Sequence, residues 1–205
     1  MPRVSKVQAA QNRDTILDVS ARLFRERGIG GVSVADLMAD AGLTHGGFYG
    51  HFDSKEALAA EACARAFTQS AERRQARIDA LPADADVPRA YAAMFLGEKN
   101  ICSPGDGCPA VGLASDIARQ PADAPARGVY AEGVEGMLQD LMSMAPAANR
   151  ADVLLRLATL VGTVTLARAT VGQPISDELL AAVRTVLAAP PEKSGWASSV
   201  LPPSG

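Results

Sequence analysis

The fold of this chain is decided by the stretch VSVADLMADAGLTHGGFYGHFDSKEAL, which runs from Val32 to Leu58. Ser33 is a typical helix N-cap, and Asp36 occupies the capping-box position three residues later. Gly42 ends this helix, because glycine adopts the left-handed backbone conformation without a steric cost. Thr44 is the next N-cap candidate, so the stretch predicts two short helices joined by a tight turn.

The second of these helices is short and polar, and it contains Gly46, Gly47 and Gly50. Each glycine costs on the order of 1 kcal/mol relative to alanine in a helix interior, so another interaction must offset the loss. A short polar helix braced by a neighbour is what a helix-turn-helix inserts into the major groove of DNA. One interpretation of the glycines is that bare backbone lets the helix lie close to DNA. The alternative is that they only permit close packing on the preceding helix.

This stretch resembles the DNA-binding signature of the TetR/AcrR family of bacterial transcriptional regulators. The positions that carry the resemblance are Arg27-Gly28, Ser33-Val34-Ala35, Ala41-Gly42-Leu43-Thr44, Tyr49, His51-Phe52 and Ser54-Lys55-Glu56. The resemblance covers about the first 60 residues tightly, and beyond them only length and helical layout agree. It implies a DNA-binding helix-turn-helix at the N-terminus and a homodimer held together by the C-terminal helices.

We expect the DNA-binding residues to lie on and beside the short polar helix. The hydroxyls of Thr44 and Tyr49 suit phosphate contacts, and His45 suits a base edge or a phosphate. Lys55 resembles the phosphate contact of the family, whereas Phe48 and Phe52 are expected in the core. The full predicted set is Ser33, Thr44, His45, Gly46, Gly47, Tyr49, His51 and Lys55.

Composition favours a helical protein that is not broadly basic. Hydrophobic residues make up 48% of the 205 residues and aromatic residues only 4%, which suits packed helices better than sheets. The formal net charge is −3, so DNA binding has to come from a local surface. The sequence has no apolar run of the roughly 20 residues that cross a bilayer and no signal-peptide pattern, and its three cysteines do not suggest a disulfide scaffold. We therefore expect a cytoplasmic protein without a membrane partner.

We predict an all-α fold of about nine helices in two domains. Residues 1–55 should form a three-helix DNA-binding domain, and residues 56–189 a helical ligand-binding and dimerisation domain reached through a long helix. The Pro-, Ser- and Gly-rich residues 190–205 are expected to form a mobile tail. The predicted helices outside the quoted stretch span 5–27, 54 to about 80, 89 to about 100, 110 to about 119, 126–144, 148–171 and a final helix capped by Ser176.

Cys108 directly precedes Pro109, so it should occupy the N-cap position of the helix that follows. The positive end of that helix favours a thiolate and raises its reactivity. Cys102 lies six positions earlier across a Pro-Gly turn, which makes a thiol switch chemically feasible. The alternative is that Cys108 is a small buried side chain at a helix start, and both interpretations stay open.

The leading hypothesis is a homodimeric repressor that binds a palindromic double-stranded DNA operator and is released by a small-molecule inducer. One alternative is a repressor that senses electrophiles or oxidants through Cys108, and a second is a helical protein-interaction module without DNA binding. The inducer should be apolar or electrophilic. We expect no enzyme activity, cofactor or metal, because no nucleophile–base set, phosphate loop or metal-ligand cluster stands out. The candidate ligand-binding residues are Met94, Phe95, Ile101, Cys108, Leu113, Met137 and Thr163.

Overall fold

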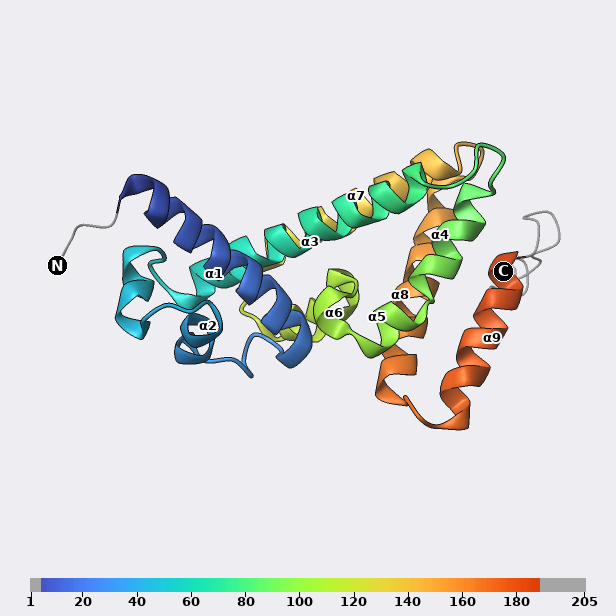
Figure 1. Ribbon diagram of the computed structural model, residues 1–205. Helices are drawn as coiled ribbons and strands as arrows, with labels where there is room; N and C mark the ends of the chain where they lie inside the picture. Colours follow the sequence, from blue (N-terminus) through green and yellow to red (C-terminus); the bar gives the residue numbers. More distant parts are fainter. Residues whose placement is uncertain (1–4, 189–205) are drawn as a thin grey trace. The chain divides into compact units, whose positions relative to one another are not determined.

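The computed structural model describes residues 5–188, and this part of the chain contains nine α-helices, two short 3₁₀ helices and no strand. The prediction of an all-α fold is therefore confirmed (Figure 1). The predicted tail 190–205 lies outside the described residues. The elements are α1 (Lys6–Arg27), α2 (Val34–Asp40), η1 (His45–Gly50), α3 (Lys55–Asp79), α4 (Val87–Phe95), α5 (Glu98–Cys102), η2 (Pro104–Asp106), α6 (Pro109–Arg119), α7 (Pro125–Met144), α8 (Arg150–Ala169) and α9 (Pro174–Ala188).

The chain packs into two compact units that do not follow its order. Unit 1 comprises residues 1–75 and 103–135, and unit 2 comprises residues 76–102 and 136–205. Packing thus joins α6 and the first half of α7 to the N-terminal helices. The predicted division between residues 55 and 56 concerns function, and it stays a prediction.

Unit 1 is built on α1, whose start and buried face follow from its sequence. The Ser5 hydroxyl accepts a hydrogen bond from the Gln8 backbone N–H at 3.1 Å, which caps the helix. The helix stops at Gly28, which has a φ of 77°. The predicted inward face is confirmed, since the five side chains expected there are all buried, namely Ile16, Leu17, Ser20, Leu23 and Phe24.

The capping box predicted for α2 is present. The Ser33 hydroxyl accepts from the Asp36 N–H at 3.1 Å, and the Asp36 carboxylate accepts from the Ser33 N–H at 2.9 Å. Gly42 follows the helix with a φ of 68°, as its place after the last turn requires. These two features determine where α2 begins and ends, and they direct the chain into η1.

The element after Thr44 is a 3₁₀ helix, not the α-helix that the sequence predicts. The Gly47 N–H donates to the Thr44 carbonyl at 2.9 Å, and the His51 N–H donates to the Phe48 carbonyl at 2.9 Å. Three glycines in six residues lower the α-helix propensity, and the tighter 3₁₀ turn serves for short segments of this kind. Thr44 occupies the N-cap position, but its hydroxyl makes no capping hydrogen bond.

Helix α6 packs against α1 inside unit 1 and contacts the turn that follows α1. The Asp116 carboxylate accepts a hydrogen bond from the Ile29 N–H at 3.1 Å. Leu113 and Ile117 belong to the same hydrophobic core as α1, α2 and η1. On α7, the Tyr130 hydroxyl donates to the Ala110 carbonyl at 2.7 Å. The turn at Gly28 is therefore held by a side chain from a helix about 90 residues further along the chain.

Unit 2 is organised around α8 and α9, which run side by side (Figure 1). The Ser176 hydroxyl donates to the Ala167 carbonyl at 3.1 Å and joins the two helices. The guanidinium of Arg168 donates to the Asn100 carbonyl at 2.7 Å, and that of Arg184 donates to the Leu96 carbonyl at 2.8 Å. These bonds tie the α4–α5 region to the C-terminal helices within the unit.

Two helix boundaries in unit 2 differ from the predicted ones. The helix predicted from residue 89 to about 100 is instead α4 and α5, separated at Leu96 and Gly97. Asp86 caps α4 by accepting from the Arg89 N–H at 3.0 Å, so the helix begins earlier than predicted. Helix α9 begins at Pro174, because proline fits the first helical position, and Ser176 is inside the helix and does not cap it.

Candidate nucleic-acid interface

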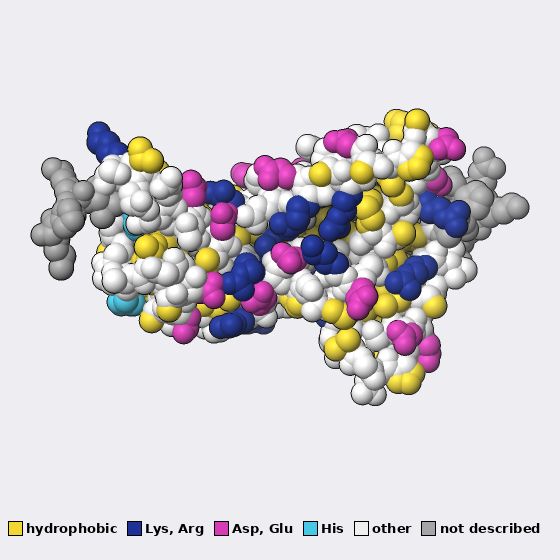
Figure 2. Space-filling view, viewed as in Figure 1, with side chains coloured by type: hydrophobic (Ala, Val, Ile, Leu, Met, Phe, Trp, Pro, Cys, Tyr) yellow, Lys and Arg dark blue, Asp and Glu magenta, His cyan; other side chains and the backbone are white. Residues whose placement is uncertain are grey.

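The short helix η1 lies at the surface of unit 1 and presents most of its residues to solvent. Its one buried residue is Phe48, while Tyr49 keeps 68% of its surface exposed. Figure 2 shows histidine side chains, coloured cyan, at the surface, and the only two histidines of the chain belong to this region. Helix α2 packs against η1 and supports it from inside. The element that the sequence singles out is therefore accessible to a macromolecule.

Two buried phenylalanines hold the exposed residues of η1 in place. Phe48 and Phe52 are 0% and 4% exposed, as predicted, and their ring centroids lie 5.8 Å apart. Tyr49 meets the Phe48 ring edge-on at 5.2 Å, and this contact restricts the direction of its side chain. Arg13 from α1 covers the Phe52 ring at 4.6 Å and pairs with Glu61 at 2.6 Å. The result is a polar surface on a rigid aromatic base.

The glycines of η1 are not required by the packing or the backbone of this chain. A Cβ atom at Gly46 or Gly50 would meet no atom within 4 Å, and one at Gly47 would meet only ordinary contacts at 3.7 Å. Among the described residues, the glycines with a positive φ are Gly28, Gly42 and Gly172. Close packing on α2 therefore does not explain the glycines of η1. Because these glycines have no side chains, the backbone is left bare on the outer surface of η1.

The other predicted DNA-binding residues surround η1, and each has a defined environment. Thr44 and His45 are exposed, and His51 is half-buried at the end of the element. Lys55 is the first residue of α3 and is half-buried. The Ser33 hydroxyl and backbone N–H both donate to the Asp36 carboxylate, at 2.6 and 2.9 Å, and these hydrogen bonds lower the pKa of the Asp36 carboxyl. Ser33 therefore shapes the start of α2 and has less capacity for an outside partner.

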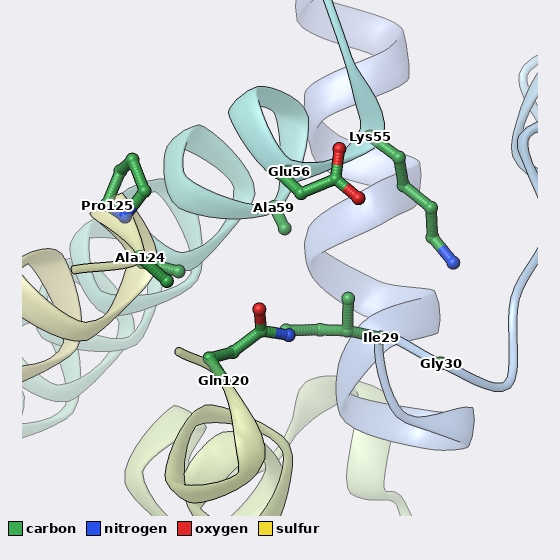
Figure 3. Close-up of a pocket in the computed structure, with 9 residues that line it drawn as sticks. Ile29, Gly30, Lys55, Glu56, Ala59, Gln120, Ala124 and Pro125 are labelled. Atoms are coloured by element: carbon green, nitrogen blue, oxygen red, sulfur yellow. The ribbon is translucent and has the colours of Figure 1, made fainter. Parts of the chain in front are cut away.

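A small cavity of about 180 Å³ lies in unit 1. Glu56 and Gln120 lie on opposite sides of it, and Lys55 lies at its edge (Figure 3). Lys55 is the one predicted site residue that lines this cavity. Its lining comes from the turn after α1, the start of α3 and the segment between α6 and α7: Ile29, Gly30, Lys55, Glu56, Ala59, Gln120, Ala124, Pro125 and Ala126.

The predicted ligand-binding residues are divided between the two units. Five of them lie in unit 2, where Phe95, Met137 and Thr163 are buried and Met94 and Ile101 are half-buried. The Thr163 hydroxyl donates to the Thr159 carbonyl within α8 at 2.7 Å. Leu113 and Cys108 lie in unit 1, and Leu113 is part of its hydrophobic core.

The three cysteines form no disulfide and lie in different surroundings. Cys102 is exposed at the end of α5 in unit 2. Cys63 is buried on α3, and burial raises the pKa of its thiol to about 12. Cys108 occupies the N-cap position of α6, as predicted, but it is buried and its side chain makes no capping hydrogen bond.

Two residues of unit 1 have structural roles that sequence reasoning missed. Asp116 reaches the Ile29 backbone, and Arg25 is a buried arginine on α1. In the sequence, Arg25 stands among charged residues of a helix end, so nothing marks it as an interior residue. Residues 5–188 contain no group of three or more His, Cys, Asp or Glu side chains that could hold a metal ion, and none of the described helices is long and apolar enough to span a membrane.

Comparison with known proteins identifies the N-terminal segment. A family model described as "Bacterial regulatory proteins, tetR family" matches residues 16–62, which include α2, η1 and the start of α3. The chain is 39% identical over 61 residues to the HTH-type transcriptional regulator AcrR of Shigella flexneri. It is 45% identical over 49 residues to the HTH-type transcriptional repressor KstR2 of Rhodococcus jostii. These matches cover 30% and 24% of this chain, and only 28% and 24% of the length of the two relatives.

The fold similarity extends over nearly the whole chain. The crystal structure of a TetR-family transcriptional regulator from Cytophaga hutchinsonii matches with a TM-score of 0.70 at 21% identity. The match covers 91% of this chain and 97% of that protein. At this identity the likeness concerns the arrangement of the helices.

Proposed function

The chain is a member of the TetR family of bacterial regulatory proteins, and from that premise we propose that it is a homodimeric transcriptional repressor in the cytoplasm. Two copies would place two η1 elements in successive major grooves of a palindromic operator. The observation that supports this proposal most directly is the set of glycines in η1. They weaken the local structure and serve no packing or conformational need in this chain, so a closely approaching partner gives them a purpose.

The residues of the interface would have different roles in DNA binding. Thr44, Tyr49 and Lys55 offer hydroxyl and ammonium donors that suit phosphate oxygens, which fix the position of a protein on the duplex. His45 lies at the exposed start of η1 and would reach a base edge or a phosphate. The contact with the Phe48 ring restricts the Tyr49 side chain, so this donor loses less entropy on binding.

Dimerisation would use the outer faces of α8 and α9. Leu154 and Leu166 on α8 are 45% and 52% exposed, and Ile175 and Val186 on α9 are 47% and 40% exposed. Large apolar side chains exposed in series on two adjacent helices favour burial against a second protein surface. A second copy of this chain supplies such a surface by symmetry, and the two recognition elements then act together.

An inducer would bind in unit 2, where five of the seven candidate ligand residues lie. Phe95, Met137 and Thr163 are buried there, and the surroundings favour an apolar small molecule. By thermodynamic linkage, an inducer that favours a conformation with poorly spaced recognition elements weakens DNA binding, and DNA weakens the binding of the inducer to the same degree.

The test is DNA retardation in a native gel with the fragments that flank the coding region, comparing wild type with Tyr49→Ala and Lys55→Ala. Both substitutions should weaken binding, and Lys55→Ala, which removes a cation, should also reduce the salt dependence by about one counterion. Lys99→Ala is the matched control, because Lys99 is an exposed lysine of unit 2. Retardation that is equally strong in all four proteins would contradict the assignment of η1. The helical interaction module without DNA binding would gain support if no fragment were retarded by wild type.

A further inference from the structure

The cavity of unit 1 brings together three polar side chains that have no partner within the described part of the chain (Figure 3). Lys55 and Glu56 come from the first turn of α3, and Gln120 directly follows the last residue of α6. Within residues 5–188, no hydrogen bond or ion pair engages the Lys55 ammonium, the Glu56 carboxylate or the side-chain amide of Gln120. Binding sites for small molecules typically combine apolar walls with a few convergent polar groups of this kind.

One wall of the cavity is the first turn of α3, where the sequence fixes both charged residues. The Ser54 hydroxyl accepts a hydrogen bond from the Ala57 N–H at 3.0 Å and caps the helix. Lys55 and Glu56 are the next two residues after Ser54, and both line the cavity. Because they form no ion pair with each other, each charge can pair with a ligand.

The other two walls are tied to the rest of unit 1. The Ile29 N–H donates to the Asp116 carboxylate at 3.1 Å, which holds the turn after α1. The Gln120 carbonyl accepts from the Arg127 guanidinium at 2.8 Å, which joins the end of α6 to the start of α7. The cavity is therefore preformed, and a preformed site loses less entropy when a ligand binds.

The size and the apolar surface of the cavity restrict the ligand to a small molecule. Ile29, Ala59 and Ala126 are 6%, 4% and 4% exposed and belong to the hydrophobic core of unit 1. An apolar cavity of about 150 Å³ holds benzene, so a volume of about 180 Å³ suits a ligand of roughly six to eight non-hydrogen atoms. Gly30 and Glu56 are exposed, so the cavity is open to solvent.

The charges around the cavity favour a ligand that carries both signs. A ligand carboxylate would pair with the Lys55 ammonium, and a ligand ammonium would pair with the Glu56 carboxylate. Gln120 lies on the opposite side from Glu56, and its side-chain carbonyl can accept a hydrogen bond from the same ammonium (Figure 3). A ligand with a negative charge alone would be repelled by Glu56, and one with a positive charge alone would be repelled by Lys55.

We propose that this cavity is a binding site for a small zwitterionic α-amino acid with a short apolar side chain, about the size of valine. The ammonium of the ligand lies between Glu56 and Gln120, its carboxylate pairs with Lys55, and its side chain packs on Ile29 and Ala59. Binding itself depends only on the geometry of unit 1 and needs no DNA. The site differs from the inducer site, which is proposed for unit 2.

Binding of the amino acid would act on DNA through Lys55, and this consequence rests on the proposed function. Lys55 is one of the proposed phosphate contacts, so a ligand carboxylate and a DNA phosphate would compete for one ammonium. By thermodynamic linkage, the amino acid would weaken DNA binding, and DNA would weaken the binding of the amino acid by the same factor. The chain would then respond to an amino acid as well as to its inducer.

The test is isothermal titration calorimetry of the full-length protein with L-valine and with two analogues that each lack one charge. Isobutylamine keeps the ammonium and lacks the carboxylate, whereas isovaleric acid keeps the carboxylate and lacks the ammonium. L-valine is expected to bind with a Kd below about 1 mM, and each analogue should bind at least about tenfold more weakly. Absence of L-valine binding, or an analogue that binds as tightly as L-valine, would overturn the proposal.

Two variants and a matched control test whether L-valine binds in the cavity. Glu56→Gln removes the carboxylate and should weaken binding at least about tenfold, and Ala59→Leu fills the cavity and should abolish binding. Glu72→Gln is the control, because Glu72 is an exposed glutamate of the same helix that does not line the cavity. Circular dichroism verifies that each variant is folded. If Ala59→Leu does not fold, Glu56→Gln decides alone, and wild-type affinity in Glu56→Gln would overturn the proposal.

A nuclear magnetic resonance titration gives an independent readout of the location. The methyl resonances of Ala59 and Ala126, which line the cavity, should shift when L-valine is added to the wild type or to Glu72→Gln. The same resonances should stay unchanged in Glu56→Gln at the same concentration. Binding that leaves both methyl resonances of the wild type in place would show that L-valine binds elsewhere and would contradict the proposal.

A DNA-retardation assay separates this inference from the proposed function, because calorimetry needs no DNA. If L-valine binds and reduces retardation by the wild type but not by Glu56→Gln, both proposals are supported. If the wild type retards DNA but binds no L-valine, the amino-acid site is wrong and the regulator proposal stands. If L-valine binds in the cavity but no fragment is retarded, the amino-acid site stands and the regulator proposal loses its support.

Discussion

Replacing the glycines of η1 by alanine should make the protein more stable and its DNA binding weaker. Gly46 and Gly50 have no positive φ, and a Cβ atom at either position would meet nothing within 4 Å. Alanine therefore fits the folded state and restricts the unfolded chain, which stabilises a protein by about 0.4–1 kcal/mol at each compatible site. The melting temperature should rise by roughly 2–4 °C for each kcal/mol gained in a chain of this size.

The same methyl groups would stand between η1 and DNA. Overpacking a close contact costs typically about 1–3 kcal/mol, and about 1.4 kcal/mol corresponds to a tenfold change in the dissociation constant. We expect Gly46→Ala and Gly50→Ala to bind the retarded fragment roughly tenfold more weakly, although both are more stable than the wild type. The combination of higher stability with weaker DNA binding is informative, because a variant that loses DNA binding by unfolding would lose stability as well.

Gly42→Ala is the matched control for this experiment. Its Cβ atom would also meet nothing within 4 Å, but its backbone has a φ of 68°, a region that costs a residue with a side chain about 1–2 kcal/mol. This variant should therefore lose stability and, below its melting temperature, keep its affinity for DNA. The measurements are thermal melts by circular dichroism and fluorescence anisotropy with the labelled fragment. Unchanged DNA affinity in Gly46→Ala and Gly50→Ala would refute the view that bare backbone faces DNA.

Other predictions follow from single contacts. Ser33→Ala removes a helix cap and should cost about 1 kcal/mol in urea unfolding at pH 7. The part of the loss that comes from the hydroxyl donating to the Asp36 carboxylate is present above the ordinary Asp pKa of 3.8 and should disappear as the pH falls through the lowered pKa of folded Asp36, and a loss that does not shrink in acid would speak against that bond. Leu166→Glu places a charge in the proposed dimer face and should give a monomer in sedimentation velocity, whereas an unchanged sedimentation coefficient of a dimer would exclude this face. Gly28→Ala combines a φ of 77° with a Cβ only 2.7 Å from the Asp116 carboxylate, so its melting temperature should fall by more than that of Gly42→Ala, and an equal fall would contradict the close approach of α6.

The sequence was sufficient for the local structure of the N-terminal segment. The cap at Ser33, the glycine at position 42 and the apolar positions of α1 act within one or two turns, so their spacing predicts the helices that are observed. The predicted helix type of η1 was wrong for a related reason. Three glycines remove the propensity that would decide between an α-helix and a 3₁₀ helix, and support from α2 settles the outcome.

The parts that could not be predicted depend on contacts between distant residues. Nothing in the order of the chain indicates that α6 packs on α1, so the roles of Asp116 and Arg25 are visible only in three dimensions. The candidate ligand residues were chosen as apolar positions along several helices, and the sequence does not indicate that Cys108 and Leu113 belong to unit 1 while the others belong to unit 2. Ser176 is a similar case. Serine is a typical N-cap residue, but the Ser176 hydroxyl donates to the Ala167 carbonyl of the neighbouring helix.

The central claim is that two copies of this chain present two η1 elements to one duplex. Hydroxyl-radical footprinting on a fragment that the protein retards tests this claim most directly. We predict two protected patches on one face of the DNA, with centres separated by about 34–36 Å or a multiple of that distance, and loss of both patches with Tyr49→Ala. A single protected patch, or a footprint that Tyr49→Ala leaves intact, would contradict the account.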